Sequence, residues 1–241
     1  MSTTELDLTA VDSISAETLV IADLTPFGVT DWPGRIAASV LLQGCPWGRT
    51  PCPWPELHDP DAPGRLSWAA ALERLEEHRG LVDGVVFSGG EPTRQLGLVA
   101  AMREVRNLGF GVGLTTAGAH PSRLATVLPE VDWVGIEILA SPESYDRITG
   151  VPGSGVKAWT SLELIQHSGV PYEVRLKVDP NVHTRDDVCD AVREIVRRGA
   201  HAPVLQEARP IGKAPEFVKA LRGRGLYDVI DVDDFPDLER R

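Results

Sequence analysis

Two cysteines lie close together in a loop rich in proline and tryptophan. Cys45 directly follows a glycine, and six residues separate it from Cys52. Thiolates are soft ligands that select zinc, copper(I) and iron–sulfur clusters. His58, a little further along the same loop, adds a ligand type common in zinc sites. Metal or redox chemistry in this loop is one interpretation, with Cys45, Cys52 and His58 as the candidate metal ligands; the other is that the cysteines are two ordinary small apolar residues.

A second segment that could carry chemistry reads Ser88-Gly89-Gly90-Glu91-Pro92 and follows a short apolar run. Glycines at such a place let a ligand approach the backbone closely. A purely structural role is also open, because a proline is well tolerated in the first turn of a helix and the segment would then be a strand-to-helix turn. The two interpretations are compatible, and we predict a turn that also contacts a ligand.

The elements that must position these residues alternate regularly along the chain. Short apolar runs predict strands at residues 35–43, 84–87, 111–115, 131–139, 172–178 and 203–207. Segments with helical spacing predict helices at residues 67–79, 93–108, 121–128, 156–168 and 185–198. Such alternation implies parallel strands joined by right-handed crossovers. We predict an α/β fold whose parallel strands form a partial (β/α)6 barrel.

In barrels of this kind, chemistry is found at the carboxyl ends of the strands. Cys45 follows the first expected strand, Glu91 the second and Thr116 the third. Glu137 and Lys177 lie on the next two strands. Lys177 has two open interpretations, a cation in the site or a strand residue with its ammonium group in water.

Composition restricts the class of protein. The chain has 241 residues and a net charge of −11, which argues against nucleic-acid binding and against electrostatic attachment to a membrane. It contains no apolar run long enough for a transmembrane helix, and its polar, acidic start does not read as a signal peptide. Three cysteines form no disulfide framework. We expect a cytoplasmic protein.

Taken together, these motifs resemble the radical S-adenosylmethionine (SAM) superfamily, and most closely the activating proteins of anaerobic ribonucleotide reductase. The likeness runs from Asp23 to Gly212. It divides the chain into an N-terminal arm (1–22), a radical SAM-like partial barrel (23–212) and a C-terminal extension (213–241). In that family, three cysteines with three and two residues between them hold three irons of a [4Fe–4S] cluster. The fourth iron binds SAM, and electron transfer cleaves SAM to a 5′-deoxyadenosyl radical.

The resemblance implies a set of cofactor-binding residues and a partner. In the family, the Gly-Gly-Glu-Pro motif contacts the amino group of SAM, and a threonine at the end of the third strand lies near it. The implied set comprises Gly89, Gly90, Glu91, Thr116, Glu137 and Lys177. The implied cofactors are a [4Fe–4S] cluster and SAM, and the implied partners are an electron donor and a glycyl-radical enzyme such as anaerobic ribonucleotide reductase.

The chain departs from the family pattern at two places. Six residues separate its two loop cysteines instead of three, and Pro55 stands where a third cysteine is expected. At the end of the fourth strand, Leu139 replaces a lysine that helps to hold SAM, and Lys177 is a candidate replacement cation. The candidates for a further cluster ligand are His58, Glu56 and Cys189, the last in an expected helix whose apolar neighbours favour a core position.

Three functions remain open on the sequence. The first is a radical SAM enzyme that cleaves SAM reductively, as the family does. The second is a degenerate member that lacks the [4Fe–4S] cluster and acts as a binding or regulatory protein. The third is a zinc or mononuclear iron protein that uses Cys45, Cys52 and His58. Measuring the iron and acid-labile sulfide content of the protein distinguishes the three functions.

Overall fold

A computed structural model describes residues 14–47, 52, 54–208 and 214–241. Within these residues, seven strands form one sheet in the order of the chain. The strands are β1 (Ile21–Gly28), β2 (Ala37–Leu42), β3 (Gly84–Gly89), β4 (Gly111–Thr116), β5 (Trp133–Ile138), β6 (Tyr172–Val178) and β7 (Val204–Glu207). Strands β2 to β7 are parallel, whereas β1 pairs antiparallel with β2. The predicted α/β fold with six parallel strands is confirmed, and β1 is an additional strand.

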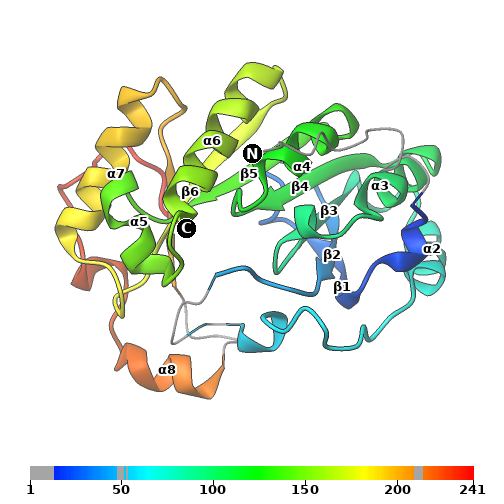
Figure 1. Cartoon of the computed structure of the whole chain (residues 1–241), viewed down its shortest axis with the longest axis horizontal. Helices are drawn as coiled ribbons and strands as arrows, with labels where there is room; N and C mark the ends of the chain where they lie inside the picture. The colour runs from blue at the N-terminus through cyan, green and yellow to red at the C-terminus, as the bar shows by residue number, and fades with distance from the viewer. Residues whose placement is uncertain (1–13, 48–51, 53, 209–213) are drawn as a thin grey trace, which may run out of the picture.

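The helices lie along the outside of the curved sheet, from α2 at one end to α7 at the other (Figure 1). They are α2 (Trp68–Glu77), α3 (Leu98–Asn107), α4 (Pro121–Val127), α5 (Pro142–Thr149), α6 (Ser154–Ser168) and α7 (Arg185–Arg197). A further helix, α8 (Pro215–Leu221), lies apart from them at the bottom of that view. Single 3-10 turns lie at Ala16–Thr18, Pro55–Leu57, Pro92–Arg94, Leu128–Glu130 and Leu226–Asp228. The five predicted helices are present, and α5 and α8 are helices that the sequence analysis did not predict.

Local signals in the sequence explain several helix ends. The Ser67 hydroxyl caps α2 by accepting a hydrogen bond from the Ala70 amide at 3.3 Å. Gly169 ends α6 in the left-handed region with φ 76°, where a side chain would be strained. Thr184 and Asp187 form a capping box at the start of α7. These signals set where α2, α6 and α7 begin or end, and therefore which side of each helix faces the sheet.

The main core fills the space between the sheet and the helices. Its largest fully buried side chains include Trp68, Phe87, Leu98, Met102, Leu114, Leu124, Ile136 and Tyr145. The Trp68 ring stacks on Phe87 at 6.2 Å between centroids, and its indole nitrogen donates to Glu104 at 2.8 Å. Burying each large apolar side chain contributes roughly 1.5–3 kcal/mol. This packing holds the carboxyl ends of the strands in fixed positions.

The end of the described chain covers the edge of the sheet at β7. The Leu205 amide donates to the Glu239 carbonyl at 2.9 Å, and the Arg241 amide donates back to the Leu205 carbonyl at 2.9 Å. The Glu207 amide donates to the Arg241 carbonyl at 2.8 Å. An uncovered edge strand would invite pairing with another chain. This segment of the C-terminal extension therefore completes the barrel edge instead of projecting from it.

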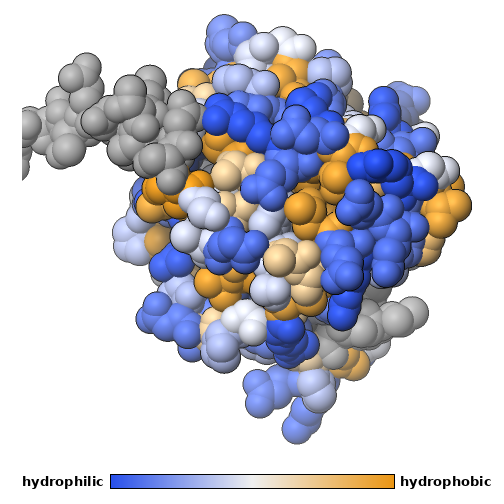
Figure 2. Space-filling view, turned by 90° about the vertical axis from the view of Figure 1, so that its right-hand side faces the viewer, coloured by the Kyte–Doolittle hydropathy of each residue, from blue (hydrophilic) through white to orange (hydrophobic). Residues whose placement is uncertain are grey.

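Hydrophobic residues on the face that carries α2 and α3 are dispersed among hydrophilic ones (Figure 2). That face therefore offers no continuous apolar surface among the residues drawn in colour. In the part of the chain that the structure describes, no helix has the length and hydropathy needed to cross a bilayer.

Candidate functional site

A cavity of about 410 Å3 opens at the carboxyl ends of the strands. Small-molecule sites typically occupy roughly 300–1,000 Å3, so this cavity has room for a ligand of nucleoside size. The candidate site residues that line it are Cys45, Cys52, His58, Gly89, Gly90, Glu137 and Lys177. The fold therefore brings seven of the nine predicted site residues to one place.

The loop that carries the cysteines is tied to the end of β2. Gly44 has φ 95°, and its amide donates to the Leu57 carbonyl at 3.0 Å. The buried Gln43 side chain donates to the carbonyls of Glu56 and Asp59 at 2.6 and 2.9 Å. These bonds fix both ends of the loop, so that Cys45 and His58 face the same cavity.

The two loop cysteines are half-buried neighbours. Burial raises the pKa of the Cys45 thiol to about 11, against a lowering hydrogen bond from the Trp47 backbone. A smaller contribution to that raised pKa comes from the charge of Cys52, which places the two sulfur atoms within electrostatic reach. The Cys52 sulfur also accepts a hydrogen bond from the Trp54 amide at 3.3 Å. A metal bound here would have to displace the Cys45 proton.

Of the other candidate ligands, only some lie at the cavity. His58 lines the cavity with both cysteines, whereas Glu56 is exposed and does not line it. Cys189 is buried on α7, where Arg185 and Asp234 are its electrostatic neighbours. Among the described residues, no three His, Cys, Asp or Glu side chains lie close enough together to hold a metal ion.

The spacing of the two cysteines also identifies which position of the family motif has changed. Three cysteines with three and two residues between them put six residues between the first and the third. Six residues separate Cys45 from Cys52, so these two match the outer pair, and Arg49 takes the middle position. Arg49, not Pro55, therefore replaces the missing cysteine; residues 48–51 and 53 lie outside the described residues.

The residues present do not fit a [4Fe–4S] cluster held by three thiolates. The loop supplies two thiols, and the third cysteine of the chain lies on α7 among other contacts. A guanidinium group carries no lone pair for iron, so an arginine in the middle position of the motif is no substitute ligand. Any iron centre in this loop would need a ligand that is not a cysteine.

Close packing of the backbone requires both glycines of the Gly-Gly-Glu-Pro motif. Gly89 has φ 105°, and a Cβ there would lie 2.5 Å from the Leu42 amide nitrogen. A Cβ on Gly90 would lie 2.7 Å from the Gly44 carbonyl oxygen. The Gly90 and Glu91 amides donate to the carbonyls of Leu42 and Gly44 at 2.8 and 3.0 Å. The glycine turn and the cysteine loop are therefore packed backbone against backbone.

Glu91 lies beneath the cavity, not in its wall. Its side chain is fully buried, and burial raises the pKa of its carboxyl group. One carboxylate oxygen accepts bonds from the Thr93 amide at 3.1 Å, the Thr93 hydroxyl at 2.6 Å and the Thr116 hydroxyl at 2.7 Å. The other accepts from the Ala117 amide at 2.9 Å. Glu91 and Thr116 together tie β3 to the end of β4.

Thr115 is a cavity residue that the sequence analysis missed. It lines the cavity, whereas its neighbour Thr116 faces Glu91. The Thr115 hydroxyl and the Trp47 indole nitrogen are buried and have no hydrogen-bond partner among the described residues. Both residues line the cavity. Buried polar atoms are normally paired, so these two unpaired groups are exceptions among the residues of the cavity wall.

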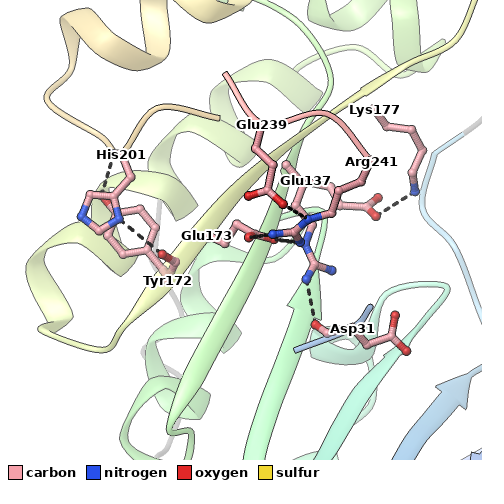
Figure 3. A network of polar contacts seen from close by, with 9 residues as sticks. Asp31, Glu137, Tyr172, Glu173, Lys177, His201, Glu239 and Arg241 are labelled. Carbon is pink, nitrogen blue, oxygen red and sulfur yellow. Dashed lines mark hydrogen bonds and ion pairs between the residues drawn. The ribbon is translucent and has the colours of Figure 1, made fainter. Parts of the chain in front are cut away.

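Glu137 and Lys177 form an ion pair in the cavity wall, with 2.8 Å between the Lys177 ammonium nitrogen and a Glu137 carboxylate oxygen. Figure 3 shows the Lys177 side chain pointing toward this carboxylate from the neighbouring strand. Leu139, the residue at the position of the family's lysine, lines the same cavity. The cation and the carboxylate therefore sit where a polar ligand can meet both.

A network of charges supports the polar side of the cavity. The Arg175 guanidinium donates to Glu173 at 2.7 Å and to the Asp31 carbonyl at 2.7 Å, and it stacks over the Trp133 ring at 5.0 Å. Arg241 pairs with the same Glu173 at 3.0 Å. Arg175 is only 3% exposed, so its charge is taken up within the protein. Arg175 and Arg241 thus share Glu173 as an ion-pair partner.

Known proteins support the fold and place the chain in a family. Residues 39–205 match the sequence model of the Radical SAM superfamily. A search of curated proteins found no match. Among solved structures, Streptococcus suis SuiB bound to S-adenosylmethionine aligns with a TM-score of 0.51 and 12% identity over 73% of this chain and 39% of that one.

A second solved structure, native anSMEcpe with bound AdoMet, aligns with a TM-score of 0.53 and 18% identity over 68% of this chain and 48% of that one. The chain thus spans less than half the length of these two neighbours. At such identity the structural likeness concerns the fold, whereas the sequence model covers most of the chain. With its parallel barrel and strand-end cavity, this chain belongs to the radical SAM superfamily.

Proposed function

We propose that this protein binds SAM in the strand-end cavity without a three-thiolate [4Fe–4S] cluster, and that it acts as a SAM-binding or regulatory protein. The observation that carries the proposal is the contrast around one cavity between an intact glycine turn and an incomplete set of thiols. Both solved neighbours are described as bound to SAM, which supports the choice of ligand.

Specific groups in the cavity suit the parts of SAM. The unpaired Thr115 hydroxyl and Trp47 indole nitrogen offer polar contacts in an otherwise buried wall. Trp54 and Leu57 add apolar surface against which an adenine ring can pack. Glu137 and Lys177 offer both charges to an amino-acid group. This mixture of apolar wall and few polar groups is typical of small-molecule sites.

A second candidate function is the family's reductive cleavage of SAM, with His58 as a non-cysteine ligand. The favouring observation is that His58 lines the same cavity as Cys45 and Cys52. The Gly-Cys loop and the Gly-Gly-Glu-Pro turn support a relation to activators of anaerobic ribonucleotide reductase. An active protein would then need an electron donor and a glycyl-radical partner in the cytoplasm. A zinc or mononuclear iron site on the same three residues would give metal without acid-labile sulfide.

Anaerobic reconstitution with iron and sulfide tests the first proposal against the others. We expect little iron and sulfide to remain after desalting, no [4Fe–4S]⁺ signal in the EPR spectrum of the dithionite-reduced protein, and an unchanged circular dichroism spectrum. A [4Fe–4S]⁺ signal that shifts on addition of SAM would contradict the proposal and favour reductive cleavage. One metal per chain without sulfide would favour the zinc or mononuclear iron function.

A further inference from the structure

The register of β5 and β6 relates Leu139 to Lys177. Glu137 pairs with Arg175, and Ile138 pairs with Leu176. One step further along the same register, Leu139 stands beside Lys177. Side chains two residues apart on a strand share a face, so Glu137 and Leu139 point the same way, and both line the cavity. A cation at Lys177 is therefore one strand away from the position where the family carries its lysine.

The ion pair in the cavity wall has capacity for a ligand. The Lys177 and Glu137 side chains are 25% and 24% exposed, so neither is sealed from the cavity. An ammonium group has three N–H donors. Within the residues that the structure describes, the Lys177 ammonium makes a single hydrogen bond, to Glu137. Because Lys177 lines the cavity, its remaining donors can serve a ligand there.

The charges in this wall select the kind of group that can bind. Lys177 and Glu137 carry opposite charges, and such a pair complements a group that itself carries one cation and one anion, as an α-amino acid does. A simple anion would meet Lys177 and be repelled by Glu137. Arg175 does not change this balance, because Glu173 and the Asp31 carbonyl take up its guanidinium. Gln206, which pairs with Lys177 across β6 and β7, adds an amide to the same wall.

We propose that Lys177 supplies, from the neighbouring strand, the cation missing at Leu139, and that Lys177 and Glu137 together bind the zwitterionic amino-acid group of SAM. Lys177 binds the α-carboxylate, and Glu137 binds the α-amino group. This inference rests on the proposed function. It assigns to two side chains the recognition of the amino-acid part of the ligand.

Isothermal titration with SAM and with 5′-methylthioadenosine, which lacks the amino-acid part, tests the proposal. We expect wild-type protein to bind SAM more tightly than 5′-methylthioadenosine. Lys177→Met should weaken SAM binding by about tenfold or more and leave 5′-methylthioadenosine binding unchanged, because only SAM carries the carboxylate. Glu137→Gln should act in the same direction. Lys219→Met, at an exposed lysine of α8, is the matched control.

A relocation variant separates a lost contact from a lost fold. Leu139→Lys combined with Lys177→Leu returns the cation to the family's position, and we expect SAM affinity within about threefold of wild type. Thermal unfolding checks that each variant is folded. If wild type binds SAM and Lys177→Met binds it equally well, the role proposed here for Lys177 and Glu137 is wrong, while the proposed function stands. If wild type binds neither ligand, the proposed function itself fails and this inference with it.

Discussion

Two neighbouring segments of the cavity differ in how the rest of the chain holds them. The glycine turn at the end of β3 is built into the packing, since each glycine lies against backbone of the Leu42–Gly44 segment and Glu91 accepts four hydrogen bonds beneath it. The cysteine loop is fixed at its two ends by bonds of Gln43 and Gly44, and the two thiols lie between these ends. Their chemistry depends on a metal.

This difference explains how one motif can stay intact while the other is lost. A change at Gly89, Gly90 or Glu91 would disturb the junction of β2, β3 and β4, whatever the protein binds. A change at position 49 removes a metal ligand of the family motif, whereas the described contacts of Glu91 and the glycines run to other residues. The glycine motif alone is therefore weak evidence for cluster chemistry, even in a confirmed superfamily member.

The largest expected effect comes from restoring the missing ligand. Arg49→Cys completes the spacing of three thiols, and we expect it to retain iron and sulfide approaching one [4Fe–4S] cluster per chain after anaerobic reconstitution. Wild type should retain little under the same conditions. Pro55→Cys is the matched control. If Pro55→Cys gains the cluster and Arg49→Cys does not, Arg49 is not the substituted position.

Replacing Glu91 should have the largest effect on stability. Glu91→Ala leaves a buried hole and removes the acceptor of the Thr93, Thr116 and Ala117 donors, so we expect the free energy of unfolding to fall by about 3–5 kcal/mol. Urea unfolding measures this loss. Glu91→Gln keeps one acceptor oxygen and should lose less. A stable Glu91→Ala protein with abolished SAM binding would instead make Glu91 a ligand contact.

A smaller loss is expected from filling the space at Gly90. The new methyl group in Gly90→Ala would meet the Gly44 carbonyl, and the cysteine loop would have to shift. Overpacking of this kind typically costs about 1–3 kcal/mol, which urea unfolding can resolve. Unchanged stability together with weaker SAM binding would show that the space at Gly90 serves the ligand and not the loop.

The smallest effect concerns the packed side of the barrel near α4. Burial and the charges of Arg123, Lys157 and Arg94 lower the pKa of His120 to about 4. Because the unfolded state binds the extra proton between about pH 6.5 and 4, stability should fall as the pH drops through that window. His120→Gln should reduce this fall by on the order of 1 kcal/mol in urea titrations at pH 7 and pH 4. Parallel curves for variant and wild type would contradict the lowered pKa.

Apolar periodicity was sufficient to predict most of the barrel. The six parallel strands and the helices that begin at Trp68 and Arg185 follow from the spacing of their apolar residues. Strand β1 was missed because half of its residues are exposed and it contains a proline. Helix α5 was also missed, although Pro142 in its first turn and Gly150 at its C-cap mark its two ends.

The details of the site depended on contacts that no local pattern encodes. Both faces of β4 are largely buried, so the sequence did not reveal that Thr115 faces the cavity and Thr116 faces Glu91. Glu137 and Lys177 are 40 residues apart, and only the strand register brings them together. The spacing of Cys45 and Cys52, by contrast, could be aligned with the family motif from the sequence alone.

Calorimetric titration of SAM into wild-type protein treated with a metal chelator tests the central claim most directly. The account predicts saturable binding with one SAM per chain, and the same affinity after anaerobic incubation with iron and sulfide, because the cavity residues and not a cluster hold the ligand. Absence of binding to the chelator-treated protein, with binding restored by iron and sulfide, would contradict it.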